Sequence, residues 1–322
     1  RTYVLSLIAS RFVRSDEELF SFMKETFYAH QYGNIEDLER QIGSVKEKLK
    51  GWDFVEGETK DTKGFVTASE LDEKELLKST DLGKRVSELY LDPLTANNLI
   101  ERMKRGKGES LTDFSVLHMI AYTLELKPFF RVRKKDQDMV DSKLIEQHEY
   151  LLCEEPNRFS DEYEPFLNSV KTAMVLEEWI DEVGEEDLYS KYGVRPGGLY
   201  SKIERGDWLL YSCYEMCNIL GFKEWKKTLR KMRIRLKNGV REELLPLLKL
   251  KGIGRVRSRR LYSNGVKDLG DVKRIDVTSL AELLGKKTAL KVKEQVGQDL
   301  DPDDVEVKKN KRKGQINLDD FT

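Results

Sequence analysis

Cysteine and histidine are scarce in this sequence, which has 322 residues but only 3 of each. The three cysteines, Cys153, Cys213 and Cys217, cannot form a disulfide framework, so we expect a reducing compartment. Cys213 and Cys217 lie one helical turn apart, yet no histidine is near them in sequence. This pattern favours small buried residues on a helix face over a metal site.

Long hydrophobic runs are also missing. No segment approaches the roughly 18 apolar residues that span a bilayer, and no signal peptide opens the chain. We therefore expect no membrane partner and a cytoplasmic location. The chain starts at Arg1 instead of Met, and an apolar helical pattern begins almost at once, at Tyr3. These features favour a piece of a longer chain.

Motifs for nucleotide hydrolysis are not found. The segment Gly106-Lys-Gly-Glu-Ser110 is not a G-x-x-x-x-G-K-[ST] loop, and no Asp-Glu pair follows a buried apolar strand. There is no Ser-His-Asp set, and the pair Glu177-Glu178 fits a solvated helix face better than an acid–base site. We expect no catalytic residue, metal or cofactor within this chain.

Charge is sorted along the chain although the formal net charge is only -1. Residues 222–239 hold eight basic side chains and one acidic one, and residues 249–260 hold six basic side chains and no acid. Acidic side chains collect at 154–164 and 177–187. A polyanionic partner would bind the basic segments preferentially.

The length predicts two or three domains, and the patterns predict a mostly α fold. Helices at 2–10, 15–30 and 34–49, followed by a hairpin of Phe54-Val55 and Phe65-Val66, would make a winged helix. Such a domain can bind nucleic acid or serve as a spacer. The predicted domains are a winged helix at 1–90, a helical bundle at 91–240, a basic helical unit at 241–298 and a disordered tail at 299–322.

The strongest local signal is the basic segment 244–262, which predicts a helix-hairpin-helix. Its turn is Gly252-Ile253-Gly254, where glycines allow close approach to a phosphate. The amide groups that open the following helix would face the anion. The alternative is a surface turn before a solvated basic helix. The predicted contacts are Lys251, Gly252, Gly254, Arg255, Arg257, Arg259 and Arg260, and a degenerate second copy is expected at 280–296.

Two further segments carry candidate contacts. In the helix predicted at 196–219, Lys202, Arg205 and Trp208 lie three apart and share one side, so Trp208 can stack on a base or belong to the core. At the C-terminus, Gln315, Leu318 and Phe321 have the spacing of a short apolar plug. That plug is either a docking peptide or a chance match.

Taken together, these segments resemble the C-terminal, non-motor half of the archaeal Hjm helicases, which are Ski2-like superfamily 2 DNA helicases. The resemblance covers essentially the whole chain. It rests on Gly-Phe-Val at 64–66, on Thr-Asp-Leu-Gly-Lys-Arg-Val-Ser-Glu-Leu-Tyr-Leu-Asp-Pro-Leu-Thr-Ala at 80–96, on residues 175–182, on Pro-Gly-Gly-Leu at 196–199 leading to Trp208-Leu-Leu, and on residues 248–262.

The resemblance implies a family of ATP-dependent 3′-to-5′ helicases that unwind branched DNA at stalled forks during replication and repair. Two motor domains, which bind ATP and Mg, would precede Arg1, and the winged helix would brace them. The helical bundle would be the ratchet, and Trp208 would stack on the single strand. Where the family usually has a basic residue, seven positions before this Trp, the chain has Ser201 with Lys202 beside it.

The resemblance further implies that the helix-hairpin-helix holds the emerging 3′ tail and restrains the motor. The tail residues Gln315, Leu318 and Phe321 look like a sliding-clamp docking peptide. An archaeal, thermophilic source would suit the 36% charged content. One rival is a non-enzymatic DNA-binding adaptor recruited by the clamp. Another is a helix-hairpin-helix nuclease or base-excision enzyme, for which the chain offers only Asp268 and Asp271 after the hairpin.

Overall fold

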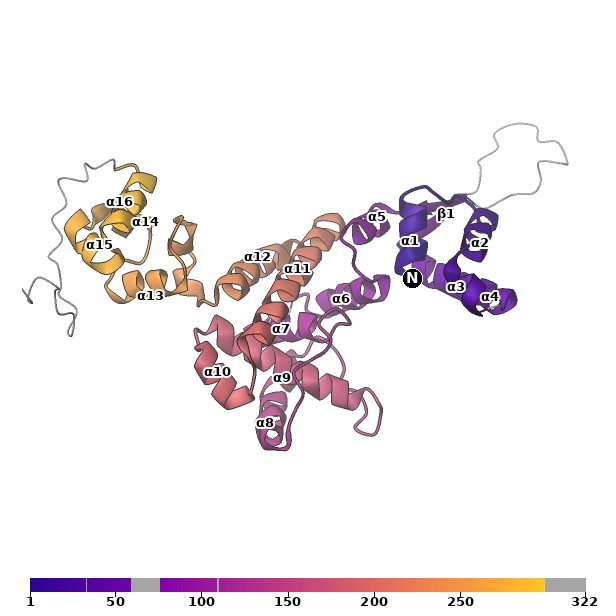
Figure 1. The fold of residues 1–322 in the computed structure, drawn as a ribbon, viewed down its shortest axis with the longest axis horizontal. Helices are drawn as coiled ribbons and strands as arrows, with labels where there is room; N and C mark the ends of the chain where they lie inside the picture. Colours follow the sequence, from indigo (N-terminus) through magenta and orange to yellow (C-terminus); the bar gives the residue numbers. More distant parts are fainter. Residues whose placement is uncertain (33, 59–75, 109, 299–322) are drawn as a thin grey trace, which may run out of the picture. The chain divides into compact units, whose positions relative to one another are not determined.

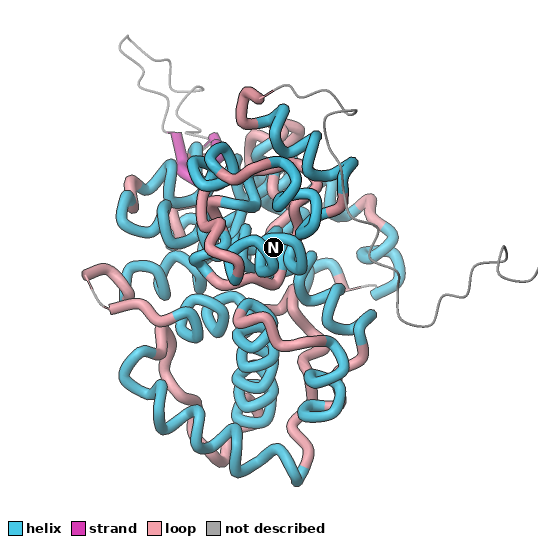
Figure 2. The backbone as a smooth tube through the Cα atoms, turned by 90° about the vertical axis from the view of Figure 1, so that its left-hand side faces the viewer, coloured by secondary structure: helices cyan, strands magenta, loops and turns pink. Residues whose placement is uncertain are grey.

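The structure is a computed structural model, and it describes residues 1–322 except 33, 59–75, 109 and 299–322. The described part is mostly helical, as predicted, with one short pair of strands (Figures 1 and 2). Contacts divide the chain into two compact units, which we describe separately. The first contains Arg1–Trp179 and Val183–Lys237, and the second contains Ile180–Glu182 and Asn238–Thr322.

The first unit begins with four helices where three were predicted. The helix expected at 15–30 is two helices, because the chain turns at Glu25 and Thr26. The predicted caps are confirmed: Ser15 accepts a hydrogen bond from the Glu18 amide at 3.2 Å, and Asn34 accepts one from the Asp37 amide at 3.2 Å. The helices are α1 Thr2–Ala9, α2 Asp16–Lys24, α3 Phe27–Tyr32 and α4 Ile35–Gly51.

The strand pair differs from the predicted hairpin. Strand β1, Val55–Glu58, pairs antiparallel with β2, Leu76–Ser79, whereas the predicted partner Phe65-Val66 lies outside the described residues. The next helix is α5, Asp81–Glu88. It lies so close to the residue that precedes β1 that a Cβ on Gly83 would be 1.9 Å from the Phe54 carbonyl oxygen. Glycine is therefore required at this crossing.

The rest of the first unit is helical, as the sequence predicted, although the contacts do not divide it from the N-terminal helices at residue 90. Pro93 and Pro196 each occupy the first turn of a helix, where the missing amide hydrogen costs nothing. Helix α10 was not predicted, because its short sequence is dominated by charge. The elements are α6 Pro93–Arg105, α7 Asp113–Ala121, η1 Lys134–Asp136, α8 Gln137–Gln147, η2 His148–Tyr150, α9 Tyr163–Ile180, α10 Glu185–Tyr192, α11 Pro196–Leu220 and α12 Lys223–Asn238.

Helix α11 runs through the packed interior of this unit beside α12 (Figure 1). A Cβ on Gly206 would lie 2.9 Å from Leu236 Cδ2, so the two helices approach closely at that point. Asp207 accepts hydrogen bonds from Arg233 of α12 at 2.8 and 3.2 Å. Cys213 and Cys217 are fully buried, which confirms the structural interpretation of this pair.

A buried ion pair stabilises the edge of the bundle. Lys171 and Asp136 are 2% and 1% exposed, and the Lys171 ammonium lies 2.7 Å from the Asp136 carboxylate. The same ammonium donates to the carbonyls of Arg131 and Tyr192. Burial alone would raise the pKa of Asp136, but hydrogen bonds from Arg133 and Lys171 outweigh it and hold that pKa well below its usual range.

The second unit is a small helical domain. The first helix predicted for the hairpin is two short 3-10 turns, because Pro246 interrupts the segment. The apolar core is formed by residues such as Leu247, Ile253, Leu261 and Val292. The elements are η3 Glu242–Leu244, η4 Leu247–Lys249, α13 Arg255–Ser263, α14 Leu269–Arg274, α15 Val277–Leu284 and α16 Lys286–Gln295.

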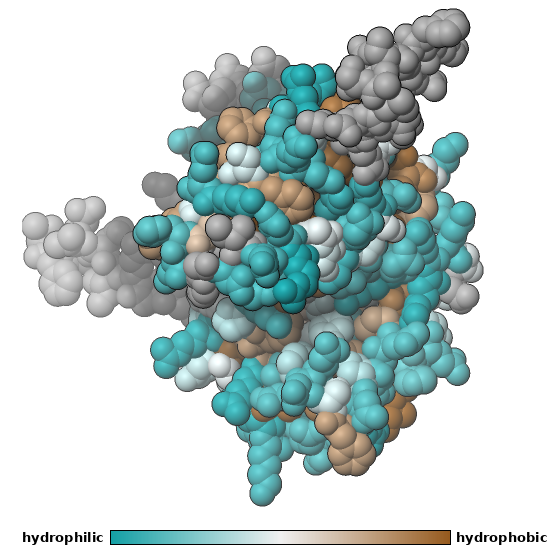
Figure 3. Space-filling view, turned by 90° about the vertical axis from the view of Figure 1, so that its right-hand side faces the viewer, coloured by the Kyte–Doolittle hydropathy of each residue, from teal (hydrophilic) through white to brown (hydrophobic). Residues whose placement is uncertain are grey.

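The surface is largely hydrophilic, with scattered apolar side chains on the face drawn in Figure 3. Isolated apolar residues on a surface are ordinary and require no partner. In the described part of the chain, no helix is both long and apolar enough to cross a membrane.

Candidate nucleic-acid interface

The predicted hairpin turn has the geometry that its glycines suggest. Gly252 has φ +85°, in the left-handed region that favours glycine. Gly254 is the N-cap of α13, and no side chain caps this helix start. A Cβ built on either glycine would meet nothing within 4 Å. The turn is therefore open on its outer side, and the first amide groups of α13 lie at that open end.

Internal contacts hold the turn in place. The Lys251 amide donates to Gln295 Oε1 at 2.7 Å, and Gln295 Nε2 donates back to the Lys251 carbonyl at 3.2 Å. Ile253, 5% exposed, anchors the turn in the apolar core. Because both the backbone and the apolar side chain are held by internal contacts, a ligand at the turn would meet a preorganised backbone.

The basic side chains around the turn have different environments. Lys251, Arg257 and Arg260 are exposed, and Arg255 is half-buried. Arg257 folds back and donates from Nη1 to the Gly252 carbonyl at 2.7 Å, which places its guanidinium beside the turn. Arg260 donates to the Leu283 carbonyl at 2.9 Å, near the C-terminal end of α15. Arg257 is therefore held beside the glycine turn.

Arg259 does not share this position, although the sequence grouped it with the other arginines. Its guanidinium donates to both carboxylate oxygens of Glu182, at 2.6 and 2.8 Å, and to Glu243 at 2.8 Å. Hydrogen bonds to Glu182 and Glu243 raise the pKa of Arg259 above its ordinary value. Because the guanidinium already donates to two carboxylates, Arg259 forms an internal ion pair in this structure instead of a phosphate contact.

The predicted second hairpin is also present. Helices α15 and α16 are joined by Gly285 alone, with φ +85°. Gly285 opens α16 as Gly254 opens α13, and the exposed side chains of Lys286 and Lys287 follow it. Buried Lys293 donates to the carbonyls of Lys273 and Ile275, so this cation stabilises the end of α14 and is not available to a ligand.

In the first unit, the three predicted contacts on α11 do not share one environment. Lys202 is only 4% exposed and donates to the Leu126 carbonyl at 2.6 Å. Burial, with a smaller contribution from the Arg205 charge, lowers the pKa of Lys202 to about 8. The spacing places Lys202 on the expected helix side, but neighbouring segments cover it. We therefore exclude Lys202 from the interface.

Arg205 and Trp208 remain accessible on the same side of α11. Arg205 is exposed and donates from Nη1 to the carbonyls of Glu125 and Lys127, at 3.2 and 2.8 Å. Trp208 is half-buried, and its indole nitrogen donates to the Leu89 carbonyl at 3.2 Å. This bond orients the ring and leaves part of it exposed. Ser201, at the position where the family pattern has a basic residue, is half-buried.

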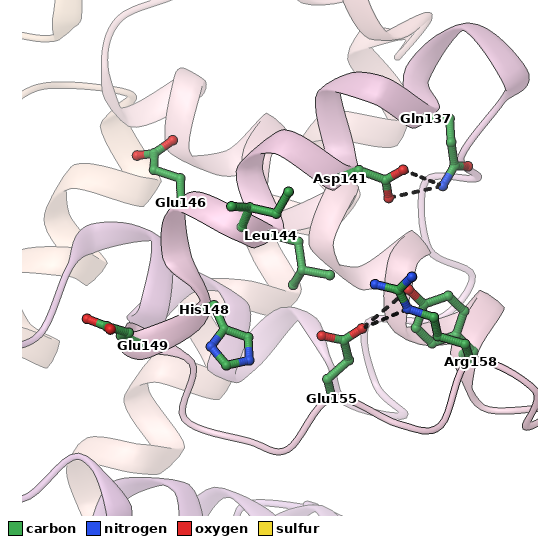
Figure 4. A pocket seen from close by; sticks show the side chains of 10 residues that line it. Gln137, Asp141, Leu144, Glu146, His148, Glu149, Glu155 and Arg158 are labelled. Carbon is green, nitrogen blue, oxygen red and sulfur yellow. Dashed lines mark hydrogen bonds and ion pairs between the residues drawn. The ribbon is translucent and has the colours of Figure 1, made fainter.

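An acidic cavity elsewhere in the first unit has the wrong charge for a phosphate. It has a volume of about 840 Å³ and lies beside α8 and the segment before α9 (Figure 4). Acidic side chains outnumber its one arginine, Arg158, which pairs with Glu155 at 3.9 Å. The acids that line the cavity are Asp141, Glu146, Glu149 and Glu155. Repulsion between these carboxylates and a polyanion excludes the cavity from the candidate interface.

Two other predictions concern metals and docking. Among the described residues, no group of three or more His, Cys, Asp or Glu side chains is placed to hold a metal ion. The predicted docking residues Gln315, Leu318 and Phe321 lie outside the described residues. The clamp-docking peptide therefore stays a prediction from the sequence.

Two protein-family models match parts of the chain. Residues 114–239 match the family described as archaeal helicase, domain 4. Residues 244–297 match the SAM-like helix-hairpin-helix tandem, which agrees with the two glycine turns at Gly252 and Gly285. The chain thus combines a domain of archaeal helicases with a tandem helix-hairpin-helix.

The similar proteins are more specific. ATP-dependent DNA helicase Hel308 of Methanococcus vannielii is 33% identical over 324 residues, covering 92% of this chain and 42% of the relative. Hel308 of Methanocella arvoryzae is 33% identical over 306 residues, covering 94% of this chain and 39% of the relative. Hel308 of Thermococcus kodakarensis is 34% identical over 286 residues, covering 88% of this chain and 24% of the relative. The chain spans less than half the length of these curated relatives. These matches fit the C-terminal part of an archaeal Ski2-like helicase, which confirms the predicted resemblance.

Proposed function

We propose that this chain is the DNA-binding portion of an ATP-dependent 3′-to-5′ DNA helicase that acts on forked or branched DNA in replication-coupled repair. It grips single-stranded DNA while motor domains, outside this sequence, hydrolyse ATP with Mg²⁺ and translocate. The chain itself hydrolyses nothing. The name of its relatives, ATP-dependent DNA helicase, supports the class of the whole protein.

The observation that carries the proposal is the open, fixed turn at Gly252-Ile253-Gly254. It presents the uncapped start of α13, with Arg257 held beside it at 2.7 Å from the Gly252 carbonyl. Amide groups at a helix start, together with a guanidinium, favour a phosphate over any neutral ligand. No base-reading side chain is required, so binding should depend on the backbone of the strand and not on its sequence.

A second contact surface on the first unit supports gripping of a single strand. Trp208 offers a partly exposed ring, and Arg205 offers an exposed guanidinium on the same side of α11. Stacking of bases on aromatic rings, combined with cations along the backbone, is a common way to hold single strands without sequence preference. We further propose that Gln315, Leu318 and Phe321 dock a sliding clamp, on the basis of the sequence alone.

The test is fluorescence-anisotropy binding of the chain to a 3′-tailed fork and to a blunt duplex over a range of salt concentrations, with ATP hydrolysis assayed alongside. We expect preference for the fork, a steep loss of affinity with salt, and no hydrolysis. Trp208→Ala and Arg257→Ala should each weaken binding. A chain that ignores DNA would refute the proposal, and hydrolysis stimulated by DNA would reveal a motor within this sequence.

A further inference from the structure

The chain leaves helix α5 in an unusual way. After the last helical residues, the Tyr90 amide donates to the Ser87 carbonyl at 3.0 Å and the Leu91 amide donates to the Val86 carbonyl at 3.3 Å. These two bonds form a Schellman motif, in which the residue at the Tyr90 position takes the left-handed conformation. Tyr90 indeed has φ +56°.

Tyrosine is a costly choice at that position. A left-handed conformation brings the Cβ of an L-residue against its own backbone, so glycine is the usual residue there. This chain follows the rule at the ends of α10 and α11, where Gly193 and Gly221 have φ +70° and +72°. Among the described non-glycine residues with positive φ, Tyr90 is the only aromatic one.

Burial of the Tyr90 ring does not offset this backbone strain. Tyr90 is 84% exposed, so its ring gains almost no burial within the protein. The apolar contact that usually accompanies a Schellman motif is made by its neighbours instead, since Leu91 and Val86 are each 0% exposed. A strained backbone that displays an exposed ring points to a role outside the folding of the chain.

The surroundings of Tyr90 indicate that role. The residue before it, Leu89, supplies the carbonyl that accepts the Trp208 indole at 3.2 Å. Two residues further on, the Asp92 amide donates to Glu125 Oε1 at 3.3 Å. Arg205 donates to the Glu125 carbonyl, so the same contacts connect the end of α5 to both accessible residues of α11. The backbone just before Tyr90 is therefore bonded to the Trp208 indole, while the phenol ring of Tyr90 is exposed to solvent.

We propose that Tyr90 is a second base-stacking platform, which binds a base of a single-stranded nucleic acid beside the base that stacks on Trp208. The inference rests on the proposed function, because it adds a contact to the same strand. Aromatic side chains next to a cation suit a single strand, in which successive bases are free to stack on protein rings. The Tyr90 side chain is 84% exposed, so a base can reach its ring.

Tyr90→Gly is a sharp test because it moves two readouts in opposite directions. Glycine relieves the backbone strain, so the thermal unfolding midpoint of the full chain should rise. Loss of the ring should weaken binding to an oligothymidylate about 5- to 150-fold, the range that corresponds to removal of a stacking side chain. Tyr90→Phe keeps the ring and should bind as the wild type does. The matched control is Phe159→Ala, since Phe159 is 98% exposed on another loop.

The outcomes separate this inference from the proposed function when Trp208→Ala is titrated in parallel. If Trp208→Ala weakens binding and Tyr90→Gly does not, Tyr90 is no platform and the proposed function still stands. If Tyr90→Gly lowers the unfolding midpoint together with affinity, Tyr90 has a structural role and the inference is overturned. If the wild type binds no oligothymidylate, both proposals fail. A raised midpoint with weakened binding, restored by Tyr90→Phe, supports the inference.

Discussion

Replacing Arg257 and Arg259 one at a time should separate a nucleic-acid contact from an internal ion pair. The two residues are two positions apart on α13, so their side chains leave the helix about 200° apart. Arg257 is exposed beside the Gly252 turn, whereas Arg259 donates to Glu182 and Glu243. We therefore expect Arg257→Ala to change DNA binding and Arg259→Ala to change stability.

The magnitudes follow from the contacts. Arg259 makes three hydrogen bonds to carboxylates, and such bonds contribute roughly 1.5–3 kcal/mol each when well shielded. Its side chain is 32% exposed and that of Glu243 is 34% exposed, so solvent screens part of the interaction. We expect Arg259→Ala to reduce the free energy of unfolding by about 2–3 kcal/mol. In a unit of this size, that loss lowers the unfolding midpoint by roughly 10 °C or more.

Arg257→Ala should leave stability within about 0.5 kcal/mol, because the side chain is exposed. Removing one contact with a single-strand phosphate should lower the slope of log affinity against log salt by about 0.7. The assay is an anisotropy titration with oligothymidylate over a range of salt, paired with calorimetry. Arg274→Ala is the control, since it removes an exposed charge that pairs with Asp271 on α14. If Arg259→Ala flattens the slope at unchanged stability, its guanidinium contacts DNA and our assignment is wrong.

Three more predictions concern single side chains. Lys171→Met removes the buried ammonium and leaves Arg133 as the remaining cation on Asp136, so the free energy of unfolding in chemical denaturation should fall by about 1.5–3 kcal/mol, and a loss below 1 kcal/mol would contradict a tight pair. Gly252→Ala, at φ +85°, should cost roughly 1–2 kcal/mol and weaken oligonucleotide binding, and unchanged binding would mean that the turn does not meet the strand. Lys202 has a pKa of about 8 in the folded chain, below the value of about 10.4 in the unfolded chain. Because the unfolded chain binds more protons between these two values, the free energy of unfolding should rise as the pH increases from about 8 to about 10.4. Lys202→Met should remove that rise in urea titrations at pH 7 to 10.5 without weakening DNA binding, and weaker binding would return Lys202 to the interface.

Much of the helical architecture was predictable because its signals are local. Apolar periodicity, the caps Ser15 and Asn34, and the prolines Pro93 and Pro196 specify where helices begin. The glycine turn of the hairpin is likewise predictable, because its signal lies in a few adjacent residues. The missed partner of β1 lies beyond a long charged segment, and neither the charge pattern nor the turn residues mark where the second strand starts.

The site was less predictable, because spacing gives the side of a helix but not what covers it. Lys202 and Arg205 follow the same spacing, yet only Lys202 is covered, since its ammonium meets the Leu126 carbonyl. Arg259 was grouped with its neighbours because its partner, Glu182, lies 77 residues earlier in the sequence. Tyr90 was missed because no apolar or charge pattern records a left-handed backbone at a non-glycine residue.

The three residues Ile180–Glu182 belong to the second unit, although the residues on both sides of them belong to the first. The helix-hairpin-helix is therefore a discontinuous domain, and no single cut in the polypeptide isolates it. A chain truncated after Lys237 would keep Glu182 while losing the arginine that neutralises it. An excised segment starting at Asn238 would keep Arg259 with only one of its two carboxylates. Deletion experiments on this domain would thus combine loss of its ligand contacts with damage at the cut, and point substitutions on α13 avoid that ambiguity.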